Sequence, residues 1–149
     1  MPISEICNRE VVILQRNSTA AEAAKLMRQH HVGDVVVVEE RGGVNVPVGI
    51  ITDRDLVVEI MAPGIDQAIV AVGDIMVSEL ATVREHAGVS ETIEYMRARG
   101  VRRVPVVDRN GALVGIIALD DLLELLAEEL LALARLVRHE QKKEMVSRR

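Results

Sequence analysis

An internal repeat is the feature that most constrains what this 149-residue chain can fold into. With an offset of 69 residues, the segment Ala20–Val38 aligns with Val89–Val107. After the pair Gly42-Gly43 the offset falls to 66, and there the two copies share a glycine and an aspartate, Gly49 with Gly115 and Asp55 with Asp121. A glycine pair is typical of a hairpin turn, where insertions are tolerated. The chain is therefore predicted to contain two copies of one structural unit.

Each copy is predicted to form a strand, a helix, two strands and a second helix. Runs of β-branched residues predict buried strands, and Thr19 with Glu22 forms the capping-box pattern that starts a helix. That helix is expected to bury Ala20, Ala24, Met27 and His31. The expected strands are Val11–Leu14, Val35–Val38, Val48–Ile51, Leu80–Thr82, Val104–Val107 and Leu113–Ile117, and a further helix is expected over Asp53–Met61.

The repeats divide the chain into three expected parts: residues 1–64, residues 65–126 and a helical extension over residues 127–149. Ile3–Cys7 is expected to open the first repeat and Val72–Met76 the second. Neither repeat is long enough to bury a core by itself. We therefore expect an α/β (α+β) protein in which two β-α-β-β-α repeats pack sheet to sheet about a pseudo-twofold axis.

The composition argues against nucleic acid and membranes as partners. Hydrophobic residues make up 49% of the chain and charged residues 28%, which suits a packed core. There is no Trp or Phe, and the net charge is -5, so surfaces that stack bases or attract phosphates are not expected. The apolar runs fall far short of the roughly 20 residues that cross a bilayer, and Met1–Arg9 does not resemble a signal peptide. A cytoplasmic protein is expected.

No residue pattern points to catalysis or to a metal site. Cys7 is the only cysteine, and His30 and His31 are adjacent instead of having the i, i+4 spacing of a helical metal pair. The sequence contains neither a nucleophile elbow nor a Walker-type loop. We therefore predict no catalytic residue, no metal ligand and no enzyme activity.

The best candidate for a ligand site is the strand that runs through Gly49 to Thr52 and turns directly into a helix. A helix start leaves backbone N–H groups unpaired, which suits a ribose phosphate. Thr52 and Asp55 also fit an ordinary helix cap. The second copy has Ala118 in place of the threonine but keeps Asp121, and a carboxylate that accepts two ribose hydroxyls would explain this.

Three short motifs occur in a fixed order, and the last occurs in both copies, although the second copy has Ala118 at the threonine position. They are Asp74-Ile75-Met76, then Gly100-Val101-Arg102-Arg103-Val104-Pro105-Val106-Val107-Asp108, then an ending of the form Gly-apolar-apolar-Thr-x-x-Asp-Leu. No single motif is specific, but the ordered set over residues 1–126 resembles a pair of CBS domains, or Bateman module. The resemblance implies a module that binds adenosyl compounds (AMP, ADP, ATP, NAD or S-adenosylmethionine) in two clefts, assembles as dimers and regulates partners without catalysis.

The resemblance also implies which residues form the two clefts. In such pairs the threonine contacts phosphate, the aspartate holds the ribose hydroxyls, and basic residues of the other repeat meet the phosphates. Carried over, the first cleft combines Ile50, Thr52, Arg54 and Asp55 with Leu80, Ala81, Arg102 and Arg103, and the second combines Ile116, Ala118 and Asp121 with Val12 and Asp34. Adenine is expected between aliphatic side chains, beside the backbone of Leu80–Thr82 or Val11–Ile13. Asp34 would repel phosphate, so the first cleft is the expected phosphate site.

The C-terminal stretch Asp120–Arg149 contains no Pro or Gly and predicts one long helix. Apolar residues at alternating four- and three-residue steps resemble a coiled-coil seam: Leu126, Leu130, Leu133 and Val137. An isolated helix is marginal in water, so this face is expected to pack against a second chain or, alternatively, against its own chain. The basic residues of Arg138–Arg149 fit a helix end, and a contact with nucleic acid or an acidic partner is the alternative.

The sequence therefore predicts a regulatory module for signal transduction that senses adenine nucleotides and forms a homodimer through its repeat helices and its C-terminal helix. The alternative is a ligand-independent dimerisation or partner-interaction module whose clefts are vestigial. A nucleic-acid-associated regulator that uses the basic tail is a third possibility.

Overall fold

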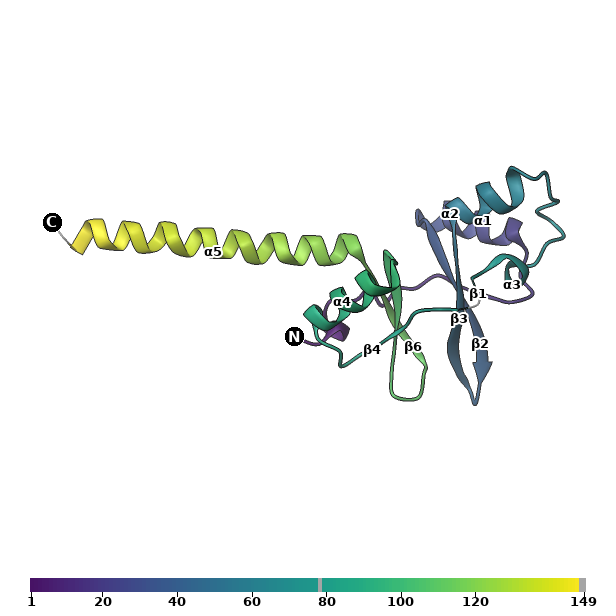
Figure 1. Cartoon of the computed structure of the whole chain (residues 1–149), viewed down its shortest axis with the longest axis horizontal. Coiled ribbons are helices and arrows are strands. Elements are labelled where there is room, and N and C mark those ends of the chain that lie inside the picture. The colour runs from purple at the N-terminus through teal and green to yellow at the C-terminus, as the bar shows by residue number, and fades with distance from the viewer. Residues whose placement is uncertain (78, 148–149) are drawn as a thin grey trace. The chain divides into compact units, whose positions relative to one another are not determined.

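The computed structural model describes residues 1–77 and 79–147 and contains two three-stranded sheets (Figure 1). The first repeat consists of β1 (Ile13–Gln15), α1 (Ala20–His30), β2 (Asp34–Arg41), β3 (Val44–Thr52), α2 (Asp53–Asp55) and the π-helix η2 (Leu56–Met61). The second repeat consists of β4 (Val83–Arg84), α4 (Val89–Arg99), β5 (Arg103–Val107), β6 (Leu113–Ala118) and α5 (Leu119–Ser147). Two short helices, η1 (Ile3–Glu5) and α3 (Val72–Ile75), precede the repeats. The predicted fold class is confirmed.

The first sheet has the order β1-β2-β3, with β1 parallel and β3 antiparallel to β2. The predicted glycine turn joins β2 to β3: Arg41 lies opposite Val44, and Gly42 and Gly43 both have positive φ angles, of 58° and 82°. Glycine adopts this conformation without a steric cost. A bulge in β3 shifts the register, so that the first residue of β2 lies opposite Thr52. The hairpin thereby brings the start of β2 and the end of β3 together at Thr52.

Helix α1 begins with the predicted capping box. The Glu22 N–H donates to the Thr19 hydroxyl at 3.2 Å, and the Thr19 N–H donates to the Glu22 carboxylate at 3.3 Å. The predicted buried face is wrong by one position, because Ala23 is buried and Ala24 is exposed. His31 is also exposed, since it ends the helix in the left-handed conformation with a φ angle of 54°.

The two opening segments are exchanged between the repeats, which corrects the expected arrangement. Residues of η1 hydrogen-bond to the second repeat, as the Ile3 N–H donates to Ala87 O at 2.8 Å and the Ser4 N–H to Glu85 O at 3.1 Å. The start of α3 bonds instead to the first repeat, through the Val72 N–H and Ser18 O at 2.8 Å. Each opening segment therefore covers the sheet of the other repeat.

The core lies on both sides of the two central strands. Val35–Val38 of β2 are fully buried, and Val104–Val107 of β5 are buried as well. A strand buried on both faces reads as a continuous apolar run instead of an alternating pattern. In the first repeat, one face of β2 packs in a cluster with Ala23 and Met27 of α1.

The chain forms two compact units, residues 1–117 and residues 118–149. The first holds both sheets except for Ala118, the last residue of β6, and the second contains helix α5. No helix among the residues that the structure describes is long and apolar enough to cross a membrane. Arg148 and Arg149, part of the predicted basic tail, lie outside the described residues.

Candidate functional site

Thr52 and Asp55 form a capping box where β3 turns into α2. The Asp55 N–H donates to the Thr52 hydroxyl at 3.1 Å, and the Thr52 N–H donates to Asp55 Oδ2 at 2.9 Å. Both side chains are half-buried. Within residues 1–77 and 79–147, the other carboxylate oxygen of Asp55 accepts no hydrogen bond. Asp55 thus caps the helix with one oxygen and keeps the other for a further donor.

The second copy keeps half of this cap. The Ala118 N–H donates to Asp121 Oδ2 at 3.0 Å, the same bond that Thr52 makes with Asp55. The sequence alone suggests ribose binding as the reason why the second copy retains Asp121. The structure supplies a second reason, because Asp121 caps the start of α5 without a threonine.

An ion pair joins the two repeats and involves Arg103, one of the residues predicted to bind phosphate. Arg103 Nε lies 3.5 Å from Asp34 Oδ1, and Asp34 is the residue of β2 directly opposite Thr52. The side chains are 31% and 23% exposed, so the pair is only partly accessible to solvent. Arg103 of the second repeat therefore lies beside the strand end that carries Thr52. Arg102 is exposed and makes no ion pair with the residues that the structure describes.

Asp34 is predicted for the second cleft but lies against Arg103, a residue predicted for the first. Burial raises the pKa of Asp34 above its usual value, Arg103 opposes this shift, and the nearby carboxylate of Asp53 adds to it. Because the neutral form is favoured, the attraction of Arg103 only partly compensates for lost hydration.

The pH dependence of stability is expected to reflect Asp34. Its raised pKa means that the folded chain binds this proton more tightly than the unfolded chain, so its contribution to stability falls as the pH rises from the ordinary value of 3.8 through the folded pKa. Asp34→Asn is therefore expected to be at least as stable as the unmodified chain at pH 7, with a weaker pH dependence. Thermal denaturation at pH 4 and pH 7 measures this. A variant that melts clearly earlier at pH 7 would show that the ion pair outweighs burial.

The other predicted residues of the first cleft lie in the same unit but differ in exposure. Ile50 on β3 and Leu80 before β4 are half-buried, Ala81 is buried, and Arg54 on α2 is exposed. The strand expected at Leu80–Thr82 begins later, as β4 at Val83, so the backbone of residues 80–82 lies outside the sheet ladder.

Two residues predicted for the second cleft have backbone groups that already form hydrogen bonds within the protein. Val12 precedes β1, and its carbonyl accepts the Val36 N–H at 2.9 Å. Ile116 on β6 exchanges two hydrogen bonds with Asn8, both of 2.9 Å. The backbone of Ile116 is therefore occupied by the exchanged N-terminal segment.

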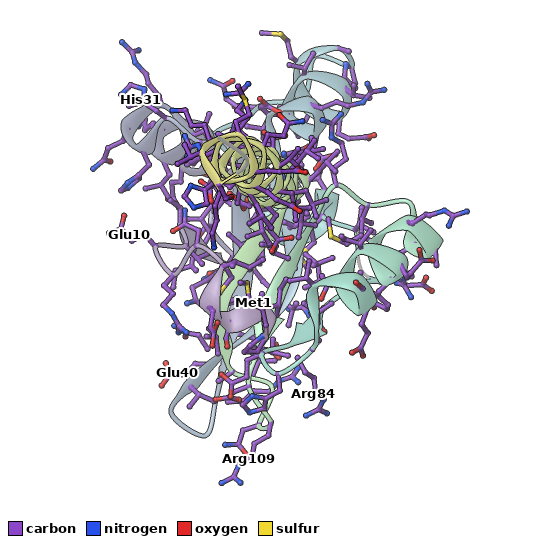
Figure 2. The ribbon with its side chains drawn as sticks, turned by 90° about the vertical axis from the view of Figure 1, so that its left-hand side faces the viewer. Met1, Glu10, His31, Glu40, Arg84 and Arg109 are labelled. Atoms are coloured by element: carbon purple, nitrogen blue, oxygen red, sulfur yellow. The ribbon has the colours of Figure 1, made fainter. Side chains whose placement is uncertain are left out.

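A cavity of about 400 Å³ between β4 and α4 was not predicted. Its lining residues are Thr82, Val83, Arg84, His86, Ala87, Glu91, Thr92 and Tyr95. Arg84 reaches the next hairpin, where its side chain donates to Arg109 O at 3.4 Å (Figure 2). The only signal in the sequence was the single aromatic residue, Tyr95, on a helix face.

The described residues contain no cluster of His, Cys, Asp and Glu suited to a metal ion.

Comparison with known proteins gives the same pattern of repeats. The sequence model of the CBS domain matches residues 3–62 and 72–128. A protein of Methanopyrus kandleri is 39% identical over 122 residues, which cover 82% of this chain and 61% of that protein. The CBS domain-containing protein YhcV of Bacillus subtilis is 36% identical over 120 residues, which cover 80% of this chain and 81% of YhcV. The chain thus spans less than two thirds of the Methanopyrus protein.

Two similar solved structures contain adenosyl ligands. A CBS domain protein of Pyrobaculum aerophilum complexed with AMP has a TM-score of 0.72 and 29% identity, over 81% of this chain and 89% of that one. The CBS domain pair of protein MJ0100, in complex with 5′-methylthioadenosine and S-adenosyl-L-methionine, has a TM-score of 0.74 and 26% identity, over 87% and 98%. With its two matched segments and its two repeated sheets, the chain belongs to the CBS domain family as a tandem pair of CBS domains.

Proposed function

We propose that the chain is a regulatory module that binds an adenine nucleotide in the first cleft and acts in signal transduction without catalysis. The observation that carries the proposal is the position of Arg103, which the Asp34 ion pair holds beside the strand end bearing Thr52. The proposal is supported by a cation of one repeat that pairs with Asp34, the residue opposite Thr52 in the sheet of the other repeat. The AMP and S-adenosyl-L-methionine complexes of similar CBS proteins support an adenosyl ligand.

Each group in the first cleft has a chemical role in this proposal. The oxygen of Asp55 that accepts no hydrogen bond takes up the ribose hydroxyls. Thr52, Arg54, Arg102 and Arg103 bind the phosphate, for which a guanidinium offers a fixed fork of donors. Ile50, Leu80 and Ala81 surround the adenine. The second copy has Ala118 in place of the threonine, so we expect at most a ligand part with little phosphate contact there.

The nucleotide displaces Asp34 from Arg103 in this mechanism. A phosphate carries more charge than one carboxylate and can accept both N–H groups of the guanidinium fork. Asp34 and the phosphate compete for the same arginine, and the two carboxylates Asp34 and Asp53 repel the incoming anion. Binding therefore replaces an ion pair between the repeats by a ligand between the repeats, which links the occupied cleft to the position of the second repeat.

We also propose a homodimer that uses the helices of the first repeat. An apolar groove between α1 and η2 is lined by Ala20, Ala24, Leu56, Val57, Ile60, Met61 and Gln67. Val57 is 52% and Met61 75% exposed, and such an exposed apolar face favours association. The alternative function, a ligand-independent interaction module, is favoured by one observation: the Thr52–Asp55 cap is complete without a ligand.

Calorimetric titration tests the proposal directly. AMP is expected to bind saturably to the full chain, with adenosine, ATP, NAD and S-adenosylmethionine as comparison ligands. Asp34→Asn is expected to raise the affinity for AMP about three- to tenfold, because it removes a competing and repelling charge at short range. The same variant is expected to leave the affinity for adenosine unchanged, since adenosine carries no phosphate.

The outcome separates the two functions. The absence of heat with every adenosyl compound, from a chain that is folded by circular dichroism, favours the ligand-independent module. If Asp34→Asn binds AMP with unchanged affinity, the proposal of an adenosyl ligand stands. In that case Asp34 and the phosphate do not compete for Arg103.

A further inference from the structure

The cavity between β4 and α4 can be compared, residue by residue, with the matching place in the first repeat. An offset of 69 residues relates the two places, because Leu14 lies opposite Val37 in the first sheet as Val83 lies opposite Val106 in the second. Three residues that line the cavity carry a hydroxyl group where the first repeat has an aliphatic side chain: Thr82 in place of Ile13, Thr92 in place of Ala23, and Tyr95 in place of Leu26.

The three hydroxyl groups have few partners within the protein. Thr92 is fully buried, and its hydroxyl donates to Gly88 O at 2.8 Å but accepts nothing from the residues that the structure describes. Thr82 and Tyr95 are half-buried, and within the same described residues their hydroxyls make no hydrogen bond. In the first repeat, by contrast, Leu26 packs against the apolar core. Because a hydroxyl removed from water without a partner costs free energy, a polar ligand would supply what this cavity lacks.

The exposed residues of the cavity lining carry charges of both signs. Arg84 uses Nη1 for a hydrogen bond of 3.4 Å to Arg109 O, and its guanidinium makes no other contact with the described residues. Glu91 Oε2 accepts the Gly88 N–H only at the long distance of 3.5 Å. A simple anion would be attracted by Arg84 and repelled by Glu91, and a simple cation the reverse. A ligand that carries both a carboxylate and an ammonium group avoids this repulsion.

We infer that the cavity binds an α-amino acid, whose carboxylate pairs with Arg84 and whose ammonium group pairs with Glu91. The hydroxyls of Thr82 and Tyr95 hydrogen-bond to the polar atoms of the same ligand. The volume of about 400 Å³ lies within the range of small-molecule sites. The side chains of the cavity belong to neither predicted nucleotide cleft, so the inference goes beyond the proposed function and does not depend on it.

Titration calorimetry of the full chain with the common L-α-amino acids, one at a time, is the first test. At least one of them is expected to bind saturably. Its α-hydroxy acid analogue lacks the ammonium group and its amide lacks the carboxylate, so each is expected to bind at least tenfold more weakly. The absence of heat with every amino acid would overturn the inference, and so would an analogue that binds as tightly as the amino acid.

A pair of variants on α4 locates the ammonium group. Glu91→Gln is expected to weaken amino acid binding at least tenfold, because it removes the charge but keeps an oxygen that can accept the Gly88 N–H. Glu94→Gln is the matched control, since Glu94 lies on the same helix, pairs with Arg97 at 3.5 Å and does not line the cavity. This control is expected to leave the affinity within about twofold. Equal effects of the two variants would overturn the assigned contact.

A double variant, Thr82→Ile with Tyr95→Leu, gives the cavity the residues of the first repeat. It is expected to abolish amino acid binding, because two of the three hydroxyls are replaced by aliphatic side chains. The same side chains occur at the matching positions of the first repeat, so circular dichroism should show the same helix content as in the unmodified chain. Amino acid binding that survives in the folded double variant would place the ligand elsewhere and overturn the inference.

Discussion

Replacement of Gly115 by alanine is expected to destabilise the protein by about 3 kcal/mol and to lower its melting temperature by about 10 °C. A methyl group at this position of β6 would lie 2.7 Å from the sulfur of Cys7 and 2.8 Å from the carbonyl oxygen of Asn8. The backbone of Asn8 cannot move aside easily, because it exchanges two hydrogen bonds with Ile116. The loss of stability should therefore include the contact between the exchanged N-terminal segment and the second repeat.

Two other glycines provide the controls. A methyl group at Gly88 would have no atom within 4 Å, and Gly88 has a φ angle of -75°. Gly88→Ala should therefore lower the free energy of unfolding by no more than about 1 kcal/mol. At Gly49, the matching position of the first repeat, the new methyl group would overlap the side chain of Met76. Met76→Ala is therefore expected to restore part of the stability that Gly49→Ala loses, since the obstacle there is a flexible side chain. Thermal denaturation of Gly115→Ala that matches the unmodified chain would contradict the close approach of residues 7 and 8.

Replacement of Asp55 by alanine is expected to reduce the affinity for AMP by about ten- to a hundredfold. The variant loses the carboxylate that accepts the ribose hydroxyls in the proposed site, and hydrogen bonds to charged groups contribute about 1.5–3 kcal/mol. The affinity for adenosine should fall by the same factor, because the ribose is common to both ligands. Titration calorimetry of the two ligands measures both effects.

The variant will also lose about 1 kcal/mol of stability, because Asp55 caps the helix start through the Thr52 N–H. Glu22→Ala is the matched control. Glu22 occupies the same capping-box position in α1 and accepts the Thr19 N–H at 3.3 Å, but it is not one of the predicted cleft residues. Both variants should melt slightly earlier than the unmodified chain. If Glu22→Ala weakened AMP binding as much as Asp55→Ala, general destabilisation and not the lost carboxylate would be responsible.

Local patterns in the sequence predicted most of the fold. The repeat, the capping box at Thr19 and the turn at Gly42-Gly43 depend on neighbouring residues, so their structures follow from short-range chemistry. The uninterrupted valines of β2 and β5 predicted strands covered on both faces, which the burial of Val35–Val38 and Val104–Val107 confirms. The helix predicted over residues 53–61 was less accurate, because after one turn it continues as a π-helix that no residue pattern indicated.

The candidate site could be predicted only in part. The positions of Thr52 and Asp55 at a strand end followed from the repeat, but the pairing of Arg103 with Asp34 depends on contacts between distant segments. Counting back along the hairpin from Gly42-Gly43 would have placed Asp34 near Thr52, and only the bulge in β3 gives the final register. The exchange of the opening segments had no local signal, since Ile3–Cys7 and Val72–Met76 look equally suited to either sheet.

Because of the exchange, each opening segment supports the repeat that is distant in the sequence and not the repeat that follows it. A peptide fused to Met1, or a cleavage after Asn8, would act first on the second repeat, whose β6 bonds to Asn8 about a hundred residues away. A fragment holding only the first repeat would keep the wrong opening segment and lack the one that its own sheet needs. The two halves are therefore interlaced, and the amino end is hydrogen-bonded to β6, the strand that leads into helix α5.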